Sequence, residues 1–310
     1  MNSVVLFPGQ GSQAPGMADP WADHEAGRAV LEEVSAAMGR DVTAGCRDPD
    51  LLGTTEFAQP ALLACDVAAF RVLEAEGVRF GAAAGHSLGE FAALVAAGVV
   101  DLPSALAVVV ARGRAMQMAS ERRPGTMTAL IGIGPDDAAE ICEIAGRGDV
   151  LAVANENAAN QVVLSGTVAA IERSEEIAKS RGARAIRLNV AGAFHSPLMQ
   201  PAVEPIREAL AATAFRAPTF PIVANVSGES VDEPAAMRAL LARHVVSPVR
   251  WERSMRTLAE AGFDAFVEAG PGQVLTKLVK RQLPGVRAAA IGSPRDASAF
   301  VRAEREGSVT

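Results

Sequence analysis

Short apolar runs alternate with longer amphipathic segments along most of the chain. Residues 4–7 form a compact apolar run that leads straight into a glycine-rich turn, which is typical of a first strand. A run of small residues, 80–84, leads through another glycine turn into 91–97, which has the composition of a buried helix. Strands that run into helices through short turns predict an α/β fold with a parallel sheet.

The alternation becomes shorter and more regular between residues 125 and 190. Strands are expected at 127–133, 151–155, 161–165 and 185–190, and helices at 135–145 and 168–180. This order, βαββαβ, is that of the ferredoxin-like fold. We therefore predict a ferredoxin-like small domain of residues 125–190, inserted into a large catalytic domain that consists of residues 1–124 and 191–310.

Local signals predict the remaining elements of the large domain. Pro60 is expected to open a helix, since proline suits a first helical position. Asp101 is expected to cap a helix that reaches residue 117. The last strand is expected at 265–268, and the tail from Gly307 is expected to fray. Further helices are expected at 27–38, 235–246, 251–261 and 274–283, and a further strand at 220–225.

The composition, 49% hydrophobic and 21% charged, is that of a soluble globular protein. Charged residues interrupt every apolar run well before the length of a membrane span, and the first residues do not resemble a signal peptide. The three cysteines lie far apart without metal-ligand spacing, which fits reduced thiols in a cytoplasmic protein. The net charge of -7 argues against nucleic acid as a partner. We expect a monomer that uses no metal and no cofactor and does not bind membranes.

The G-x-S-x-G pattern at 85–89 is the strongest candidate for chemistry. Between a strand and a helix, this pattern forms a tight turn that presents the serine, Ser87, as a nucleophile. The glycines permit the strained turn, and the N–H of Leu88 lies at the start of the helix, where it favours a developing negative charge. Because glycine and serine are common residues, the pattern taken alone is equally compatible with a chance match.

A serine nucleophile needs a base, and the chain has four histidines. We favour His195, which lies in a loop at the predicted domain junction, where core packing is a weak explanation. His86 is expected to pack beneath the turn, His24 to lie on the surface and His244 to be structural. No acidic residue stands out as a third member, and a main-chain carbonyl can also orient the imidazole.

Arg112 directly follows the apolar helical run 105–111. If its side chain points inward, the charge must meet a carboxylate, because an unpaired buried charge is costly. The partner is either an acidic residue of the protein, which is the more common case, or the substrate.

Several motifs together resemble those of malonyl-CoA:acyl carrier protein transacylases. The resemblance runs from residue 4 to about residue 285, in the order and spacing of that family. The motifs are FPGQGSQ at 7–13, QPAL at 59–62, GHSLGE at 85–90, RGRAMQ at 112–117, FHSPLM at 194–199 and EAGPG at 268–272. The resemblance implies an α/β-hydrolase-like large domain with a nucleophile elbow and an inserted ferredoxin-like small domain.

The resemblance also implies an acyltransferase, an acyl carrier protein S-malonyltransferase, that works in a ping-pong cycle. Ser87 would attack malonyl-CoA, with His195 as the base, and the resulting malonyl ester would pass to the phosphopantetheine thiol of an acyl carrier protein. The backbone N–H groups of Gln10 and Leu88 would form the oxyanion hole. The main-chain carbonyl of His244 would orient the catalytic imidazole.

For the substrate, the resemblance implies that Arg112 binds the free malonyl carboxylate as a two-pronged clamp. Gln59, Asn155 and Asn157 match positions that line the pocket, although the residues around the two asparagines depart from the common sequence. Phe194 matches the malonyl-selective pattern, in which bulk before the catalytic histidine excludes a methyl branch. One methyl group changes the free energy by only about 1–3 kcal/mol, so this exclusion is expected to be incomplete.

Other functions remain open at this point. The same turn occurs in serine hydrolases such as thioesterases, and a chain with this fold could also be a non-catalytic module that docks carrier proteins. The chain could also act in trans on a polyketide assembly line with a different acyl unit, and the residues do not separate fatty-acid from polyketide synthesis. Candidate cations for carrier-protein docking are Lys277, Lys280, Arg281 and the arginines at 122–123.

Overall fold

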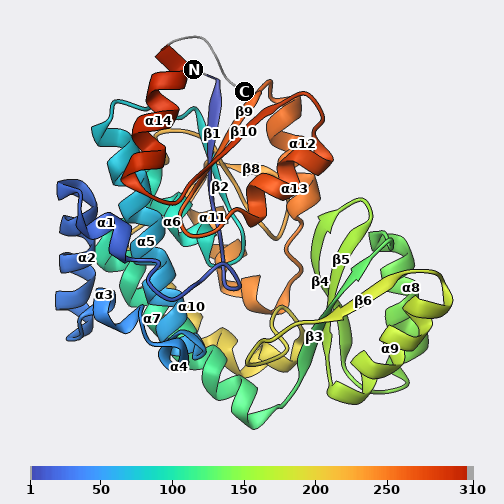
Figure 1. Cartoon of the computed structure of the whole chain (residues 1–310). Coiled ribbons are helices and arrows are strands. Elements are labelled where there is room, and N and C mark those ends of the chain that lie inside the picture. The colour runs from blue at the N-terminus through green and yellow to red at the C-terminus, as the bar shows by residue number, and fades with distance from the viewer. Residues whose placement is uncertain (1, 306–310) are drawn as a thin grey trace.

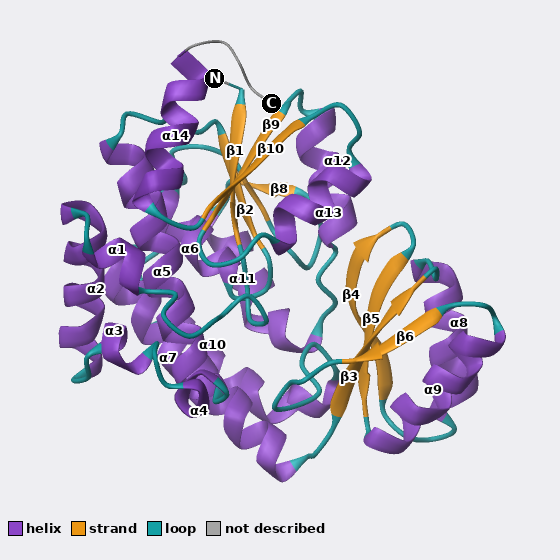
Figure 2. Ribbon diagram, viewed as in Figure 1, coloured by secondary structure: helices purple, strands orange, loops and turns teal. Residues whose placement is uncertain are grey.

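The computed structural model describes residues 2–305, and its larger part is built on a six-stranded sheet of order β10-β9-β1-β2-β7-β8 (Figures 1 and 2). Its strands are β1 (Ser3–Phe7), β2 (Ala82–Gly85), β7 (Ile222–Val223), β8 (Ser230–Val231), β9 (Ala265–Ala269) and β10 (Arg287–Ile291). All neighbours pair in parallel except β7 and β8, which are antiparallel. Phe7 pairs with Gly85, so the loops that follow β1 and β2 leave the sheet side by side.

Helices cover both faces of this sheet, because alternate residues of its central strand are buried on opposite sides. Val5 and Phe7 belong to the core under α5, α6 and α14, whereas Val4 and Leu6 belong to the core under α12 and α13 (Figure 1). The helices of this part are α1 (Asp19–Ala22), α2 (Glu25–Met38), α3 (Val42–Gly45), α4 (Pro49–Leu52), α5 (Thr55–Ala75), α6 (Gly89–Ala96), α7 (Leu102–Arg122), α10 (Val203–Ala211), α11 (Pro234–Arg243), α12 (Trp251–Glu260), α13 (Val274–Gln282) and α14 (Pro294–Arg305), with 3₁₀ turns η1 (Pro197–Ala202) and η2 (His244–Val246).

The smaller part is a four-stranded antiparallel sheet of order β4-β5-β3-β6, with α8 and α9 on the face turned away from the large sheet (Figure 2). Its elements are β3 (Thr126–Ile131), α8 (Pro135–Gly146), β4 (Leu151–Ala158), β5 (Gln161–Gly166), α9 (Val168–Ser180) and β6 (Arg184–Arg187). This is the ferredoxin-like order, and together with the parallel sheet it confirms the predicted fold class. The domain boundaries at residues 125 and 190 stay a prediction.

The structure differs from the sequence prediction in a few elements. Pro60 does not open its helix but lies inside α5, which begins at Thr55. The strand at 265–268 is not the last, because β10 follows at the edge of the sheet and α14 packs beside it. Three consecutive alanines in β10 have a low strand propensity, and pairing with β9 overrides it. The tail from Gly307 lies outside the described residues.

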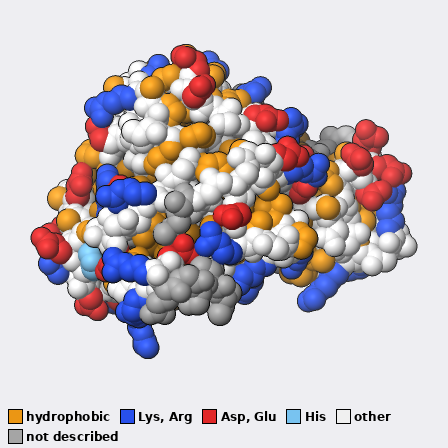
Figure 3. Space-filling model, turned by 90° about the horizontal axis from the view of Figure 1, so that it is seen from above, with side chains coloured by type: hydrophobic (Ala, Val, Ile, Leu, Met, Phe, Trp, Pro, Cys, Tyr) orange, Lys and Arg blue, Asp and Glu red, His pale blue; other side chains and the backbone are white. Residues whose placement is uncertain are grey.

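No helix within residues 2–305 is both long and apolar enough to cross a membrane. The same residues contain no cluster of three or more His, Cys, Asp or Glu side chains arranged to hold a metal ion. The three cysteines are free thiols, and two of them are buried. Seen from above, the described surface carries cations, anions and apolar side chains interspersed (Figure 3).

Candidate active site

The turn between β2 and α6 holds Ser87 in a left-handed conformation, with φ of 52°. Such a backbone is unfavourable for a residue with a Cβ and is found where the surroundings enforce it. Gly85 and Gly89, on either side of the turn, must be glycine because other backbone atoms lie very close to them. A Cβ on Gly85 would lie 1.9 Å from the carbonyl carbon of Gly89, and a Cβ on Gly89 would lie 2.1 Å from the carbonyl oxygen of Phe7. The nucleophile turn therefore packs so closely on itself and on the end of β1 that only glycine fits at positions 85 and 89.

Ser87 and His195 are in direct contact. The Ser87 Oγ lies 2.8 Å from the His195 Nε2, and the His195 Nδ1 lies 3.1 Å from the carbonyl oxygen of His244 and 3.0 Å from that of Ser247. Two carbonyl acceptors require a proton on Nδ1, which leaves Nε2 free to accept the serine proton. Burial, and then the positive charge of Arg112, lower the pKa of His195 to about 3, so the imidazole is neutral.

Arg112 lies on α7, is only 1% exposed and points at the nucleophile. Its Nη1 donates to the Gln59 Oε1 at 2.7 Å, and its Nη2 donates to the Ser87 Oγ at 3.2 Å. Within the described residues no carboxylate lies within 4.0 Å of the guanidinium, and its Nε has no hydrogen-bond partner. The structure thus lacks the acidic partner that is common for a buried arginine, and the charge is available to an anionic ligand beside Ser87.

Glu90, in the first turn of α6, does not neutralise this charge. Its side chain is buried, and burial raises its pKa to about 8, against the opposing effects of the Asn225 N–H and Arg112. The carboxyl group is therefore mostly protonated at neutral pH. Its Oε2 accepts a hydrogen bond from the Asn225 N–H at 3.1 Å.

The loop after β1 lies against the nucleophile turn. A Cβ on Gly9 would lie 2.3 Å from the His86 carbonyl oxygen and 3.6 Å from the Leu88 nitrogen. No hydrogen bond from the backbone N–H of Leu88 or of Gln10 is found among residues 2–305. Both amides are therefore free to receive an oxyanion, and their assignment to an oxyanion hole stays a prediction.

A cleft of about 210 Å³ opens between the two sheets beside this turn. Asn155 and Asn157 line it from β4, opposite Gln10 and α13. The Asn157 Oδ1 lies 2.9 Å from the His86 Nε2, so one of the two predicted pocket asparagines is held by the residue before the nucleophile. His86, the residue before the nucleophile, also lines the cleft, so the cleft lies next to the nucleophile turn.

The remaining predicted residues lie in several places. Gln59 contacts Arg112 and, at 3.4 Å, the side chain of Gln10, and Phe194 is buried in the core directly before His195. The ring of His86 packs 5.3 Å from that of Trp251. His24 is half-buried and caps α2 by accepting the Ala26 N–H.

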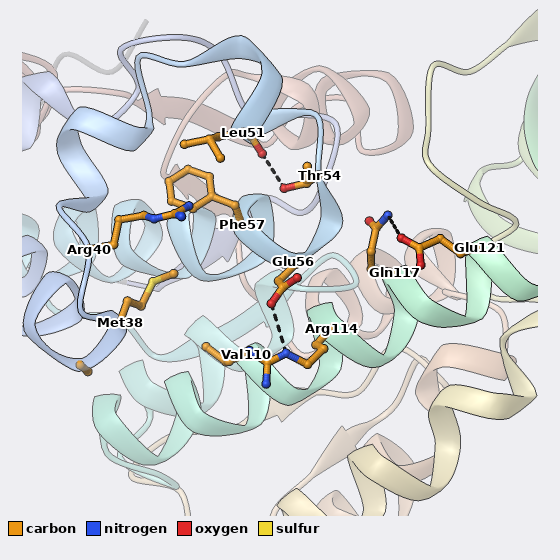
Figure 4. A pocket seen from close by; sticks show the side chains of 11 residues that line it. Met38, Arg40, Leu51, Thr54, Glu56, Phe57, Val110, Arg114, Gln117 and Glu121 are labelled. Atoms are coloured by element: carbon orange, nitrogen blue, oxygen red, sulfur yellow. Dashed lines mark hydrogen bonds and ion pairs between the residues drawn. The ribbon is translucent and has the colours of Figure 1, made fainter.

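A larger cavity, of about 680 Å³, lies between α2, α5 and α7 (Figure 4). A Glu56–Arg114 ion pair at 3.1 Å joins α5 to α7 in its wall, and Gln117 donates a hydrogen bond to Glu121 along α7. None of the predicted site residues lines this cavity. The candidate site therefore lies away from this cavity, beside the smaller cleft that Gln10, His86 and Asn155 line.

Two residues of the site were missed by the sequence analysis. Ser247 contributes a main-chain carbonyl, for which no side-chain signal exists. Asn225 bonds to the backbone of Ser87, and it was seen only as the end of an expected strand. A polar residue that ends an apolar run at the carboxyl edge of a parallel sheet is a signal that could have found it.

Comparisons with known proteins point to one family. The family model described as the acyl transferase domain matches residues 4–307. The malonyl CoA-acyl carrier protein transacylase of Escherichia coli (strain K12) is 40% identical over 296 residues, 94% of this chain and 96% of the relative. The Bacillus subtilis (strain 168) transacylase is 35% identical over 308 residues, 98% of this chain and 97% of the relative.

Solved structures give the same result. The acyl-carrier-protein S-malonyltransferase from Burkholderia pseudomallei 1710b superposes with a TM-score of 0.93 at 38% identity, covering 97% of this chain and 100% of the other. A malonyl-transacylase in complex with its type II polyketide synthase acyl carrier protein also reaches a TM-score of 0.93, at 35% identity and with 97% of this chain and 99% of the other covered.

Proposed function

This chain belongs to the acyl transferase family, and we propose that it transfers a malonyl group from malonyl-CoA to the phosphopantetheine thiol of an acyl carrier protein. The observation that carries the proposal is the position of the Ser87 Oγ, within hydrogen-bond distance of both a neutral imidazole and a buried guanidinium without an acidic partner. A nucleophile, a base and an anion-binding group thus meet at one oxygen.

In the first half-reaction, His195 accepts the Ser87 hydroxyl proton at Nε2 while the Ser87 Oγ attacks the thioester carbonyl carbon. The negative charge that develops on the carbonyl oxygen is stabilised by the N–H groups of Leu88 and Gln10. Collapse of the tetrahedral intermediate breaks the carbon–sulfur bond, and His195 returns the proton to the sulfur of the leaving CoA. The product is a malonyl-serine ester.

In the second half-reaction, the thiol of the carrier protein occupies the place of the CoA sulfur. His195 takes the thiol proton, the sulfur attacks the ester carbonyl carbon, and the released Ser87 oxygen regains the proton. The carbonyl oxygens of His244 and Ser247 hold the imidazole in one tautomer throughout. This arrangement does the orienting work that a carboxylate does in a Ser-His-Asp triad.

Arg112 supplies selectivity for a diacid. A malonyl carboxylate can replace the Ser87 Oγ as the acceptor of the Arg112 Nη2 and so free the nucleophile. An acetyl group has no such acceptor, and the loss of a hydrogen bond to a charged group corresponds to about 1.5–3 kcal/mol.

Intact-mass measurement after mixing with malonyl-, methylmalonyl- and acetyl-CoA tests the proposal. We expect one malonyl adduct per chain that is absent in Ser87→Ala, with little acetyl adduct. Acetyl loading equal to malonyl loading would refute the role of Arg112. Adding carrier protein distinguishes transfer from hydrolysis, because a thioesterase would release free malonate instead of malonyl-carrier protein.

We also propose that the protein acts as a monomer in the cytoplasm, where its CoA and carrier-protein substrates are found, and that it binds neither nucleic acid nor membranes. Light scattering coupled to size-exclusion chromatography tests the oligomeric state. A dimer mass at micromolar concentration would contradict it. The same chemistry serves fatty-acid and polyketide synthesis.

A further inference from the structure

Asn225 spans the nucleophile turn from the neighbouring strand. It follows β7, which pairs in parallel with β2, so its side chain lies at the sheet edge from which the turn projects. It is fully buried. Its Oδ1 accepts the Ser87 N–H at 2.7 Å, and its Nδ2 donates to the Gly85 carbonyl oxygen at 2.6 Å. The two contacts fix the orientation of the amide, because one needs an acceptor and the other a donor.

These two hydrogen bonds hold the backbone around Ser87, the residue of the turn whose backbone conformation is least favourable. The φ of 52° at Ser87 requires outside support, and the Asn225 amide binds the backbone on both sides of His86. Binding the Ser87 N–H also commits that donor. The N–H of Leu88, next along the chain, is thereby left as the donor of the turn that faces the reacting carbonyl.

Asn225 is itself held in place by contacts of its own backbone. Its backbone N–H donates to the Glu90 Oε2 at 3.1 Å, and its carbonyl oxygen accepts the Arg250 N–H at 2.9 Å. Ser87, Asn225 and Glu90 therefore form a closed set of contacts between β7, the turn and the first turn of α6. A closed set of this kind has little freedom to shift.

We propose that Asn225 is a positioning residue, whose side-chain amide holds Ser87 on its strained turn so that the Oγ stays in line with the imidazole and the Leu88 N–H stays free. The inference rests on the proposed function for its reaction. The geometric part concerns the nucleophile alone and can be measured without malonyl transfer.

The test compares Asn225→Ala and Asn225→Asp with Ser174→Ala, a control that also removes a fully buried hydrogen-bonding side chain, but in α9 of the smaller part. The measurements are kcat and KM with malonyl-CoA, the rate at which a fluorophosphonate modifies Ser87, and the thermal melting temperature. The fluorophosphonate reports on nucleophile geometry and has no carboxylate for Arg112.

We expect Asn225→Ala to lower kcat and the fluorophosphonate rate together by about ten- to a hundredfold, with KM changed less than threefold. Asn225→Asp keeps the acceptor for the Ser87 N–H but faces the Gly85 carbonyl with a carboxylate, so its loss should be intermediate. Ser174→Ala should leave both rates within twofold of wild type, even where its melting temperature falls as far as that of Asn225→Ala.

Fluorophosphonate rates of Asn225→Ala within threefold of the control would overturn the proposal. If that variant does not fold, Asn225→Asp decides, and a wild-type rate in it would overturn the proposal equally. Wild-type protein that reacts with the fluorophosphonate but forms no malonyl adduct would refute the proposed function, while the comparison of variants would still stand.

Discussion

Replacing Glu90 with glutamine removes one titratable group from beneath the nucleophile and leaves the side-chain shape unchanged. The wild-type carboxyl has a pKa of about 8 in the folded protein and 4.5 as its ordinary value. Between these pH values the folded state binds more protons than the unfolded state, so the free energy of unfolding falls as pH rises. Below pH 4.5 the carboxyl is protonated in both states, and above pH 8 the loss is complete.

The size of the effect follows from the two pKa values. One pKa unit corresponds to about 1.36 kcal/mol, so the loss between pH 4.5 and 8 amounts to about 5 kcal/mol. Burial lowers the pKa of His195 and His244 in the folded protein, so these two groups make stability rise with pH while the unfolded histidines lose their protons. This contribution is the same in wild type and Glu90→Gln and cancels in the difference between them. Arg112 keeps its proton across the same window, since its pKa of about 10 lies above it.

Urea unfolding at pH 5.5, 7.0 and 8.5 measures this difference. Relative to Glu90→Gln, the wild type should lose stability by roughly 1.4 kcal/mol per pH unit across this range up to pH 8. The variant should stay active at pH 7, because glutamine can still accept the Asn225 N–H. The exposed Glu208→Gln is the control and should follow the wild type. Parallel curves for wild type and Glu90→Gln would refute a buried, protonated carboxyl.

Three further predictions concern the substrates. Arg112→Gln should slow malonyl loading by about ten- to a hundredfold while acetyl loading falls less, as read from intact masses, whereas Arg114→Gln on the exposed side of the same helix should load normally. Phe194→Ala should raise methylmalonyl loading relative to malonyl by about 5- to 150-fold, and an unchanged ratio would remove its role in selectivity. Reversing the charge of the exposed Lys277 and Lys280, on the helix that lines the cleft, should raise KM for carrier protein several-fold and leave KM for malonyl-CoA unchanged. A KM for carrier protein equal to that of the wild type would exclude the face of Lys277 and Lys280 as the docking surface.

The sequence was informative wherever a local pattern has a single structural meaning. The glycines around Ser87 predict the turn, and the apolar run before Arg112 indicates that its charge, if it points inward, must meet a carboxylate. The orienting carbonyls of His244 and Ser247 are main-chain groups, so residue type says nothing about the acceptors of the His195 proton. The contact of Asn225 with the turn joins residues that are 138 positions apart, and only the strand order brings them together.

The proposed roles of Arg112 and His195 would couple selection of the acyl group to the strength of the base. In the free protein the positive charge of Arg112 is the second cause, after burial, of the low pKa of His195. In the proposed binding mode, a malonyl carboxylate on Arg112 would neutralise that charge and so raise the proton affinity of the imidazole at the moment when it must accept the Ser87 proton. An acetyl group leaves the charge in place, and the base stays weak. Discrimination against acetyl-CoA should therefore appear in kcat as well as in KM, whereas a clamp that only binds would change KM alone.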